Sequence, residues 1–209
     1  MKVAGLLLAH PAFILRGQYG RRHQQLRALK RLRRYLDTGA DPPEPLEPDL
    51  TPHQQLPSAD EVCSWLYSLP TTSPEGVACD VEAAGHHLRL IGFARFSDEC
   101  YMPVLLRGVG GSLAYPYRDL QRMVRATYWA LGNPQVPKWF HNGYGYDIPT
   151  QLEATGFAVR GFAGDTLLMQ RYAAPESPAD LQYLGITYGN LGSWKHWLKT
   201  RDDDTEENK

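Results

Sequence analysis

Alternating apolar and polar positions predict three strands in the first half of the chain. A short apolar run within residues 76–82 turns polar at Asp80 and Glu82, which is typical of a buried strand whose end reaches solvent. Apolar and polar residues then alternate over 88–96, and a third strand is expected over 102–106. Because these segments follow one another at hairpin distance, we expect an antiparallel start to a mixed sheet.

Apolar residues recur at helical spacing in several other segments. They predict helices over 21–36, 117–131, 148–155 and 167–172, one starting at Ser58 and one starting at Ser177, with further strands over 1–9 and 136–140. Ser58 and Glu61 have the spacing of a capping box at the start of their helix. Strands that alternate with helices indicate an α/β fold.

Charge is distributed unevenly along the chain. The formal net charge is −1, so the protein as a whole is not a basic nucleic-acid binder. However, residues 1–36 contain Arg and Lys but no Asp or Glu, whereas residues 199–209 are acidic. The basic helix over 21–36 either packs by its leucine stripe as an ordinary solvated helix or contacts phosphates. Residues 37–57 are rich in Pro and predict an extended linker.

The rest of the composition is that of an ordinary globular protein. Hydrophobic residues make up 43% of the 209 positions, which allows a sizeable core. The cysteines Cys63, Cys79 and Cys100 have no CxxC spacing, which argues against a zinc knuckle or a disulfide framework and favours reduced thiols in the cytoplasm. The longest apolar run near the start is too short to span a membrane, so we expect no membrane partner.

Two carboxylates two residues apart give the first candidate site. Positions i and i+2 of a strand face the same side, so Asp80 and Glu82 project side by side. Adjacent carboxylates repel and are costly to bury unless a cation offsets their charge. A hard cation such as Mg²⁺ or Mn²⁺ is the natural ligand. The alternative is a solvated strand end without a metal.

A second polar cluster follows the strand over 136–140. It contains Asn142, Tyr144, Tyr146 and Asp147, and it leads directly into a helix. Strand-to-helix junctions at the carboxyl edge of a sheet are where α/β folds place ligands, so Asp147 is expected to approach Asp80 and Glu82. Asp147 has a second interpretation as a helix N-cap. Asp165, before the next helix, is better explained as a cap than as a metal ligand.

In this order the motifs resemble the DEDD superfamily of 3′–5′ exonucleases, and most closely the proofreading domain of family A, phage-type DNA polymerases. The likeness covers about residues 58–198: an Asp-x-Glu strand, a hairpin sheet, Asn-x4-Asp at a helix start, Asp-Thr-Leu-Leu-Met and a Ser-Pro-x-x-Leu helix. It implies a ribonuclease-H-like fold with a mixed sheet flanked by helices. Asp80 and Glu82 match the first exonuclease motif, and Asn142 and Asp147 match the second.

The resemblance also implies a chemistry. In that family carboxylates hold two divalent ions, one activating a water and one stabilising the leaving 3′ oxygen. Asp80 would bridge both Mg²⁺ or Mn²⁺ ions, Glu82 would bind one, and Asp147 would bind the second. Asn142 would contact single-stranded DNA at its 3′ end. Tyr144 and Tyr146 would either stack on frayed bases or pack in the core.

The chain departs from the family at the third motif, which should be Tyr-x3-Asp or His-x4-Asp beyond Trp194-Lys195. His196 and Asp202 miss this spacing by one residue. We therefore expect a domain over 58–198 without its last helix, as in a split or truncated gene from a bacterium or phage-infected cell, followed by an acidic tail over 199–209. Another chain or polymerase segment would supply the missing motif.

Residues 1–36 resemble a different family, the uracil-DNA glycosylases. The stretch His10-Pro11-Ala12-Phe13-Ile14-Leu15-Arg16 is similar to that family's last motif, in which a basic helix follows. The glycosylase's water-activating motif and cluster-binding cysteines are missing, so this segment is interpreted as a strand-helix remnant without glycosylase activity.

Two hypotheses for function stay open. The first is a two-metal 3′–5′ exonuclease, motivated by the ordered pair of acidic motifs. The second is a non-catalytic nucleic-acid-binding or polymerase-assembly module, motivated by the missing third motif and the basic helix.

Overall fold

The computed structural model describes residues 21–40, 56–85, 87–96, 101–108, 111–189 and 191. The predicted strand over 1–9, the His10-Pro11 stretch, most of the Pro-rich segment, His196 and the acidic tail lie outside these residues. The chain divides into two compact units, residues 52–169 and residues 1–51 together with 170–209. The domain boundaries expected from the sequence stay predictions.

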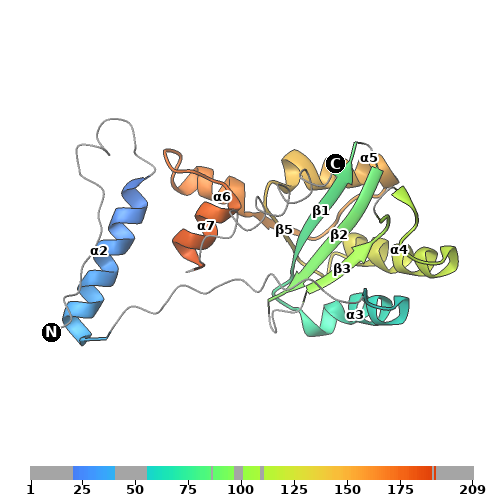
Figure 1. Ribbon diagram of the computed structural model, residues 1–209, viewed down its shortest axis with the longest axis horizontal. Helices are drawn as coiled ribbons and strands as arrows, with labels where there is room; N and C mark the ends of the chain where they lie inside the picture. Colours follow the sequence, from blue (N-terminus) through green and yellow to red (C-terminus); the bar gives the residue numbers. More distant parts are fainter. Residues whose placement is uncertain are drawn as a thin grey trace, which may run out of the picture. The chain divides into compact units, whose positions relative to one another are not determined.

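A mixed five-stranded sheet forms the centre of the unit over 52–169 (Figure 1). Its strands are β1 (Val77–Ala84), β2 (His87–Arg95), β3 (Tyr101–Leu105), β4 (Lys138–Phe140) and β5 (Phe162–Asp165), in the order β3-β2-β1-β4-β5. The pairs β1–β2 and β2–β3 are antiparallel, whereas β4 is parallel to both β1 and β5. This is the sheet of a ribonuclease-H-like α/β fold, as the sequence predicted.

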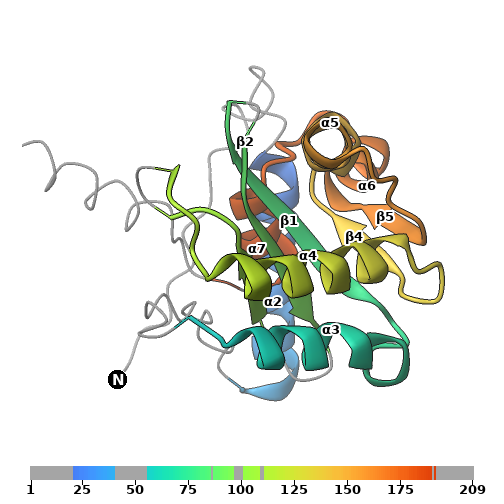
Figure 2. The ribbon, with the colours of Figure 1, turned by 90° about the vertical axis from the view of Figure 1, so that its right-hand side faces the viewer.

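Two helices lie side by side across one face of this sheet, α3 (Ala59–Thr72) and α4 (Tyr117–Gly132) (Figure 2). The capping box at the start of α3 is confirmed: the Ser58 Oγ accepts the Glu61 N–H at 3.3 Å, and the Glu61 carboxylate accepts the Ser58 N–H at 2.7 Å. No helix in the described ranges is both long enough and apolar enough to cross a lipid bilayer.

The core lies between these helices and the strands. On β1 the side chains of Val77, Cys79 and Val81 are buried, and those of Asp80 and Glu82 are exposed. Each fully buried aliphatic or aromatic side chain contributes roughly 2 kcal/mol through removal of apolar area from water. Because burial alternates along β1, the two acidic residues share the face away from this core, as predicted.

A fully buried lysine anchors the start of β4. The Lys138 ammonium donates hydrogen bonds to the carbonyl oxygens of Asn133 at 2.6 Å and Arg160 at 2.8 Å. Burial lowers its pKa to about 8. These bonds fix the two loops that enter β4 and β5, because both carbonyl groups are bound to one side chain.

Two expectations about elements were wrong. No strand was expected over residues 162–165, which directly precede the predicted helix over 167–172, but they form β5, because their N–H and C=O groups pair with β4. The helix expected at Ser177 is α7 (Leu181–Tyr188), which begins later because the Asp180 side chain caps it by accepting the Tyr183 N–H at 3.0 Å.

The remaining helices agree with the periodicity. They are α5 (Ile148–Thr155), α6 (Thr166–Ala173) and, in the other unit, α2 (Arg21–Thr38). On α2, Leu29 and Leu36 are exposed, so two residues of the predicted leucine stripe are not packed.

Candidate functional site

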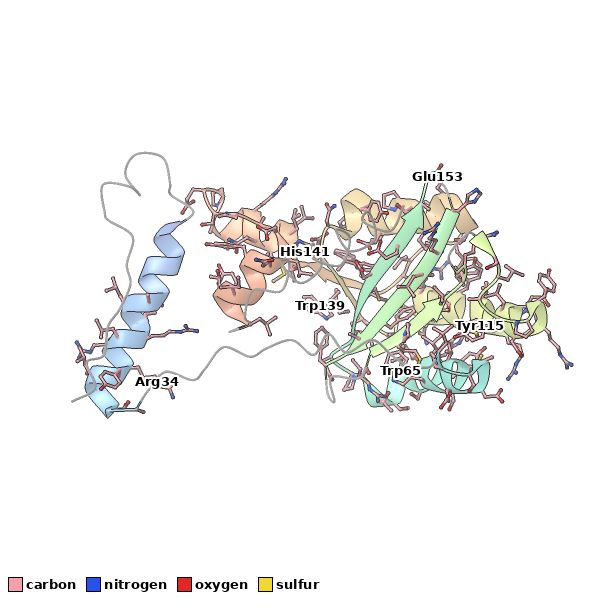
Figure 3. The ribbon with its side chains drawn as sticks, viewed as in Figure 1. Arg34, Trp65, Tyr115, Trp139, His141 and Glu153 are labelled. Atoms are coloured by element: carbon pink, nitrogen blue, oxygen red, sulfur yellow. The ribbon has the colours of Figure 1, made fainter. Side chains whose placement is uncertain are left out.

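The carboxyl ends of β1, β4 and β5 meet at one edge of the sheet, because these strands are parallel. Ala78 is paired with Trp139, so Asp80 and His141 lie two residues further along adjacent strands. Phe140 is paired with Asp165, which ends β5. Figure 3 labels Trp139, which lies on β4, and His141, which follows β4.

Asp147 reaches the same edge from the segment that follows β4. It ends a single π-helical turn, Gly143–Asp147, is 2% exposed, and accepts the Val81 N–H through Oδ1 at 2.9 Å. The predicted approach of Asp147 to Asp80 is therefore confirmed by a bond to the residue next to Asp80. Asp147 lies at the N-cap position of α5, but its side chain makes no capping hydrogen bond there. The alternative interpretation of Asp147 as a side-chain helix cap is therefore wrong.

Ionisation of both Asp80 and Asp147 is electrostatically unfavourable. Burial, and then the charge of Asp80, raise the pKa of Asp147 to about 6, with a smaller contribution from Asp165. Burial also raises the pKa of Asp80, while the Val81 N–H and the charge of His141 oppose the rise. A bound cation would relieve this penalty on both carboxylates.

Glu82 is less closely involved than expected. It lies on the same face of β1 as Asp80 and is exposed. Within the described residues no three His, Cys, Asp or Glu side chains are grouped closely enough to hold a metal ion. The structure thus brings together Asp80 and Asp147, but it does not gather Asp80, Glu82 and Asp147 into a three-ligand centre.

The geometry of the π-helical turn depends on small residues. Asn142 adopts a left-handed conformation with φ 69°, which Asn tolerates better than most residues. A Cβ at Gly143 would lie 2.5 Å from the Phe140 Cβ, and one at Gly145 would overlap the Asn142 Oδ1. A side chain at Gly143 would displace Phe140 or the turn that carries Asp147, whereas one at Gly145 would require the Asn142 side chain to move.

Asp165 holds the next junction together. Its Oδ1 accepts the N–H groups of Leu167 at 2.9 Å and Leu168 at 3.3 Å, which confirms the predicted cap of α6. The same oxygen accepts the Asn142 N–H at 3.0 Å. Its Oδ2 is buried and, within the described part of the chain, has no hydrogen-bond partner. Asp165 therefore fixes the loop before Asp147 and leaves one carboxylate oxygen unsatisfied.

His141 is a site residue that the sequence interpretation did not select. Its Nδ1 lies 2.9 Å from the Thr166 Oγ1, and its charge acts on Asp80. The Thr166 hydroxyl also donates to the Phe140 carbonyl at 3.3 Å. The available signal was its position directly after a strand, next to Asn142.

The two tyrosines of the turn are exposed, which argues against the alternative that they pack in the core. Tyr144 is 58% exposed and Tyr146 42%. The Tyr144 ring touches Phe162 with a centroid separation of 4.6 Å. Neither side chain is part of the core, so both offer aromatic surface beside the carboxylates.

The donor set fits a divalent cation in part. Asp80 and Asp147 offer carboxylate oxygens, the ligands that Mg²⁺ and Mn²⁺ favour, and Glu82 lies on the same strand face. The unsatisfied Asp165 Oδ2 adds negative charge near Asp147. The arrangement attracts a cation and does not by itself complete its coordination.

No protein-family model and no curated protein matches the chain. Among solved structures, an EXD2 exonuclease domain soaked in Mn and GMP is 23% identical with a TM-score of 0.38, over 63% of this chain and 65% of that chain. The same domain soaked in Mg is 20% identical with a TM-score of 0.39, over 70% and 78%. The POL domain of Pol1 from M. smegmatis, complexed with DNA primer-template and dNTP, is 19% identical with a TM-score of 0.47, over 64% of this chain and 22% of that chain.

Proposed function

We propose that the chain is a metal-dependent 3′–5′ exonuclease of the proofreading type, acting on the 3′ end of single-stranded DNA. The observation that carries the proposal is the buried Asp147 carboxylate, bonded to the Val81 N–H beside Asp80 at the carboxyl edge of the sheet. A buried acid beside an exposed acid, both with raised pKa values at one edge of the sheet, is typical of a functional site.

Each residue has a role in this proposal. Asp80, Glu82 and Asp147 would hold two Mg²⁺ or Mn²⁺ ions, which when bound supply an activated water and neutralise the leaving oxygen. Asn142 contacts the strand, and the exposed rings of Tyr144 and Tyr146 stack on its terminal bases. Asp165 keeps the turn in place through the Asn142 N–H.

The origin and partner are part of the proposal. We infer a fragment of a phage-type DNA polymerase, located in the cytoplasm, that works with a polymerase segment carrying the third acidic motif. This partner accounts for the incomplete ligand set of the described residues.

Degradation of a 5′-labelled single-stranded oligonucleotide tests the proposal. The purified chain, alone and with a segment carrying a Tyr-x3-Asp helix added in trans, is incubated with Mg²⁺, with Mn²⁺ and with chelator. We expect a metal-dependent ladder that shortens from the 3′ end and disappears with Asp80→Ala. Asp119→Ala, which removes a partly exposed acid of α4, is the matched control and should keep the ladder. Cleavage that persists in chelator would contradict the proposal.

A second candidate function is a nucleic-acid-binding module without turnover. The finding that favours it is that the described residues contain no three-ligand metal cluster. This function predicts oligonucleotide binding without a ladder, even after a segment with a Tyr-x3-Asp helix is added in trans.

A further inference from the structure

A pocket lies at the edge of the sheet opposite the carboxylates. It has a volume of about 570 Å³ and is lined by residues at the end of α4 and by the segment 156–160. These segments lead into β4 and β5, whereas His141 and Asp165 follow or end those strands. The three-residue β4, about 10 Å long, therefore lies between the pocket and the candidate active site.

Aromatic faces form much of this pocket. Tyr128 and Phe157 stack with a centroid separation of 4.6 Å and an interplanar angle of 13°. Trp129 contacts Tyr67 edge-on at 5.0 Å. Phe157 is 43% exposed and Trp129 38%, so each ring keeps a face available to a ligand. Flat, exposed and internally supported rings are suitable platforms for planar ligands.

One cation accompanies these rings. Arg160 lines the pocket, and no acidic side chain does. Its backbone is held on both sides: the N–H donates to Leu131 at 2.9 Å and the carbonyl accepts from Lys138 at 2.8 Å. The backbone of Arg160 is thus fixed, and none of the ion pairs within the described residues involves its guanidinium.

We propose that this pocket is a second binding position for single-stranded nucleic acid, with bases on Phe157 and Trp129 and a phosphate against Arg160. This inference rests on the proposed function only for the kind of ligand, a single DNA strand. It adds to that function a contact with the strand outside the carboxylate site. A cation beside aromatic platforms, without a carboxylate, matches a strand of phosphates and planar bases. An apolar protein surface would offer no negative charge to the Arg160 guanidinium, which has no ion-pair partner among the described residues.

Binding is measured by fluorescence anisotropy of a labelled oligothymidylate with the full chain in chelator, so that no cleavage is needed. Trp129→Leu and Phe157→Leu keep apolar packing but remove a flat ring, and each should weaken binding roughly tenfold. Arg160→Ala should reduce the slope of log affinity against log salt by about 0.7, and Arg160→Lys should restore it. Tyr117→Leu and Arg89→Ala are the matched controls, exposed on α4 and β2.

The outcomes separate this proposal from the nuclease assignment. Weaker binding by the pocket variants, with unchanged controls, supports the second position even if no ladder is ever seen. Affinity and salt slope equal to the parent chain in the pocket variants, or equally weakened binding by Tyr117→Leu and Arg89→Ala, would overturn it. In that case a ladder abolished by Asp80→Ala would still support the nuclease assignment.

Discussion

At the scale of single residues, Asp147 is the carboxylate of the site whose ionisation is most unfavourable. Its carboxylate is buried, accepts one backbone N–H, and faces the charge of Asp80. The folded chain therefore holds a proton on Asp147 more tightly than the unfolded chain does. Stability must depend on pH through this residue.

The sign of this dependence follows from the pKa of about 6 in the folded state. Asp147 is protonated without cost at low pH, and its penalty grows as pH rises from about 4 to about 6, reaching about 3 kcal/mol above that range. Asp147→Asn should therefore unfold at higher urea concentration than the parent chain near neutral pH in chelator. Near pH 4 the two should coincide. Equal midpoints at both pH values would refute this, and Asp119→Asn is the control.

Sequence reasoning found the acidic residues of this site because spacing alone places i and i+2 of a strand on one face. It also found Asp147, since an acid directly after a strand-to-helix junction reaches the sheet edge. It did not select His141, whose role depends on the register between β1 and β4, a long-range pairing. It also grouped Glu82 with the two aspartates, although spacing cannot fix how far a side chain reaches.

At the scale of elements, the π-helical turn Gly143–Asp147 decides where the acid lies. Gly143→Ala would place a Cβ 2.5 Å from the Phe140 Cβ. Such overpacking should destabilise the fold by about 1–3 kcal/mol in urea unfolding and lower the proposed nuclease activity. Gly132→Ala is the control, because its Cβ would meet Phe157 at an ordinary 3.8 Å. Equal stability of Gly143→Ala and the parent would count against this account of the turn.

The start of α3 offers a second test at this scale. Ser58→Ala removes the oxygen that accepts the Glu61 N–H, so it should cost about 1 kcal/mol in urea unfolding. Ser64→Ala, exposed within the same helix, should change stability little. If the two variants were equally stable, the capping box would not contribute.

Helices were predicted more accurately than the shortest strands. The periodicity over 117–131 and 148–155 gave α4 and α5 nearly to the residue. β5 has only four residues, Phe162–Asp165, with a glycine among them, so no local pattern marks it. Its pairing with β4 alone makes it a strand. The π-helical turn likewise arises from the close packing of Gly143 and Gly145 rather than from apolar periodicity.

At the scale of the whole molecule, positive and negative charge are concentrated in different segments of the chain, although the net charge is −1. Most of the basic residues of the segment 1–36 lie on the helix α2, where Lys30 and Arg34 are exposed. If α2 contacts phosphates, its contribution to nucleic-acid binding should be steeply salt-dependent and independent of sequence.

This predicts that Lys30→Glu combined with Arg34→Glu weakens oligonucleotide binding and flattens its salt dependence. The slope should fall by about 0.7 for each phosphate that α2 no longer neutralises. The same charge reversal at Arg118 and Arg125 of α4 is the control. Anisotropy across a salt series measures both. Equal effects of the two double variants would indicate general charge rather than phosphate binding by α2.

The mixed pairing of β1 also has a kinetic consequence. The strands β1 to β3 form a local meander, but Val81 meets Asp147 across a sequence separation of 66 residues. Interactions across such a separation require closure of a long loop and tend to form late in folding. The repulsion between Asp80 and Asp147 should then be missing from the transition state. In stopped-flow measurements, Asp147→Asn should slow unfolding and leave the folding rate unchanged.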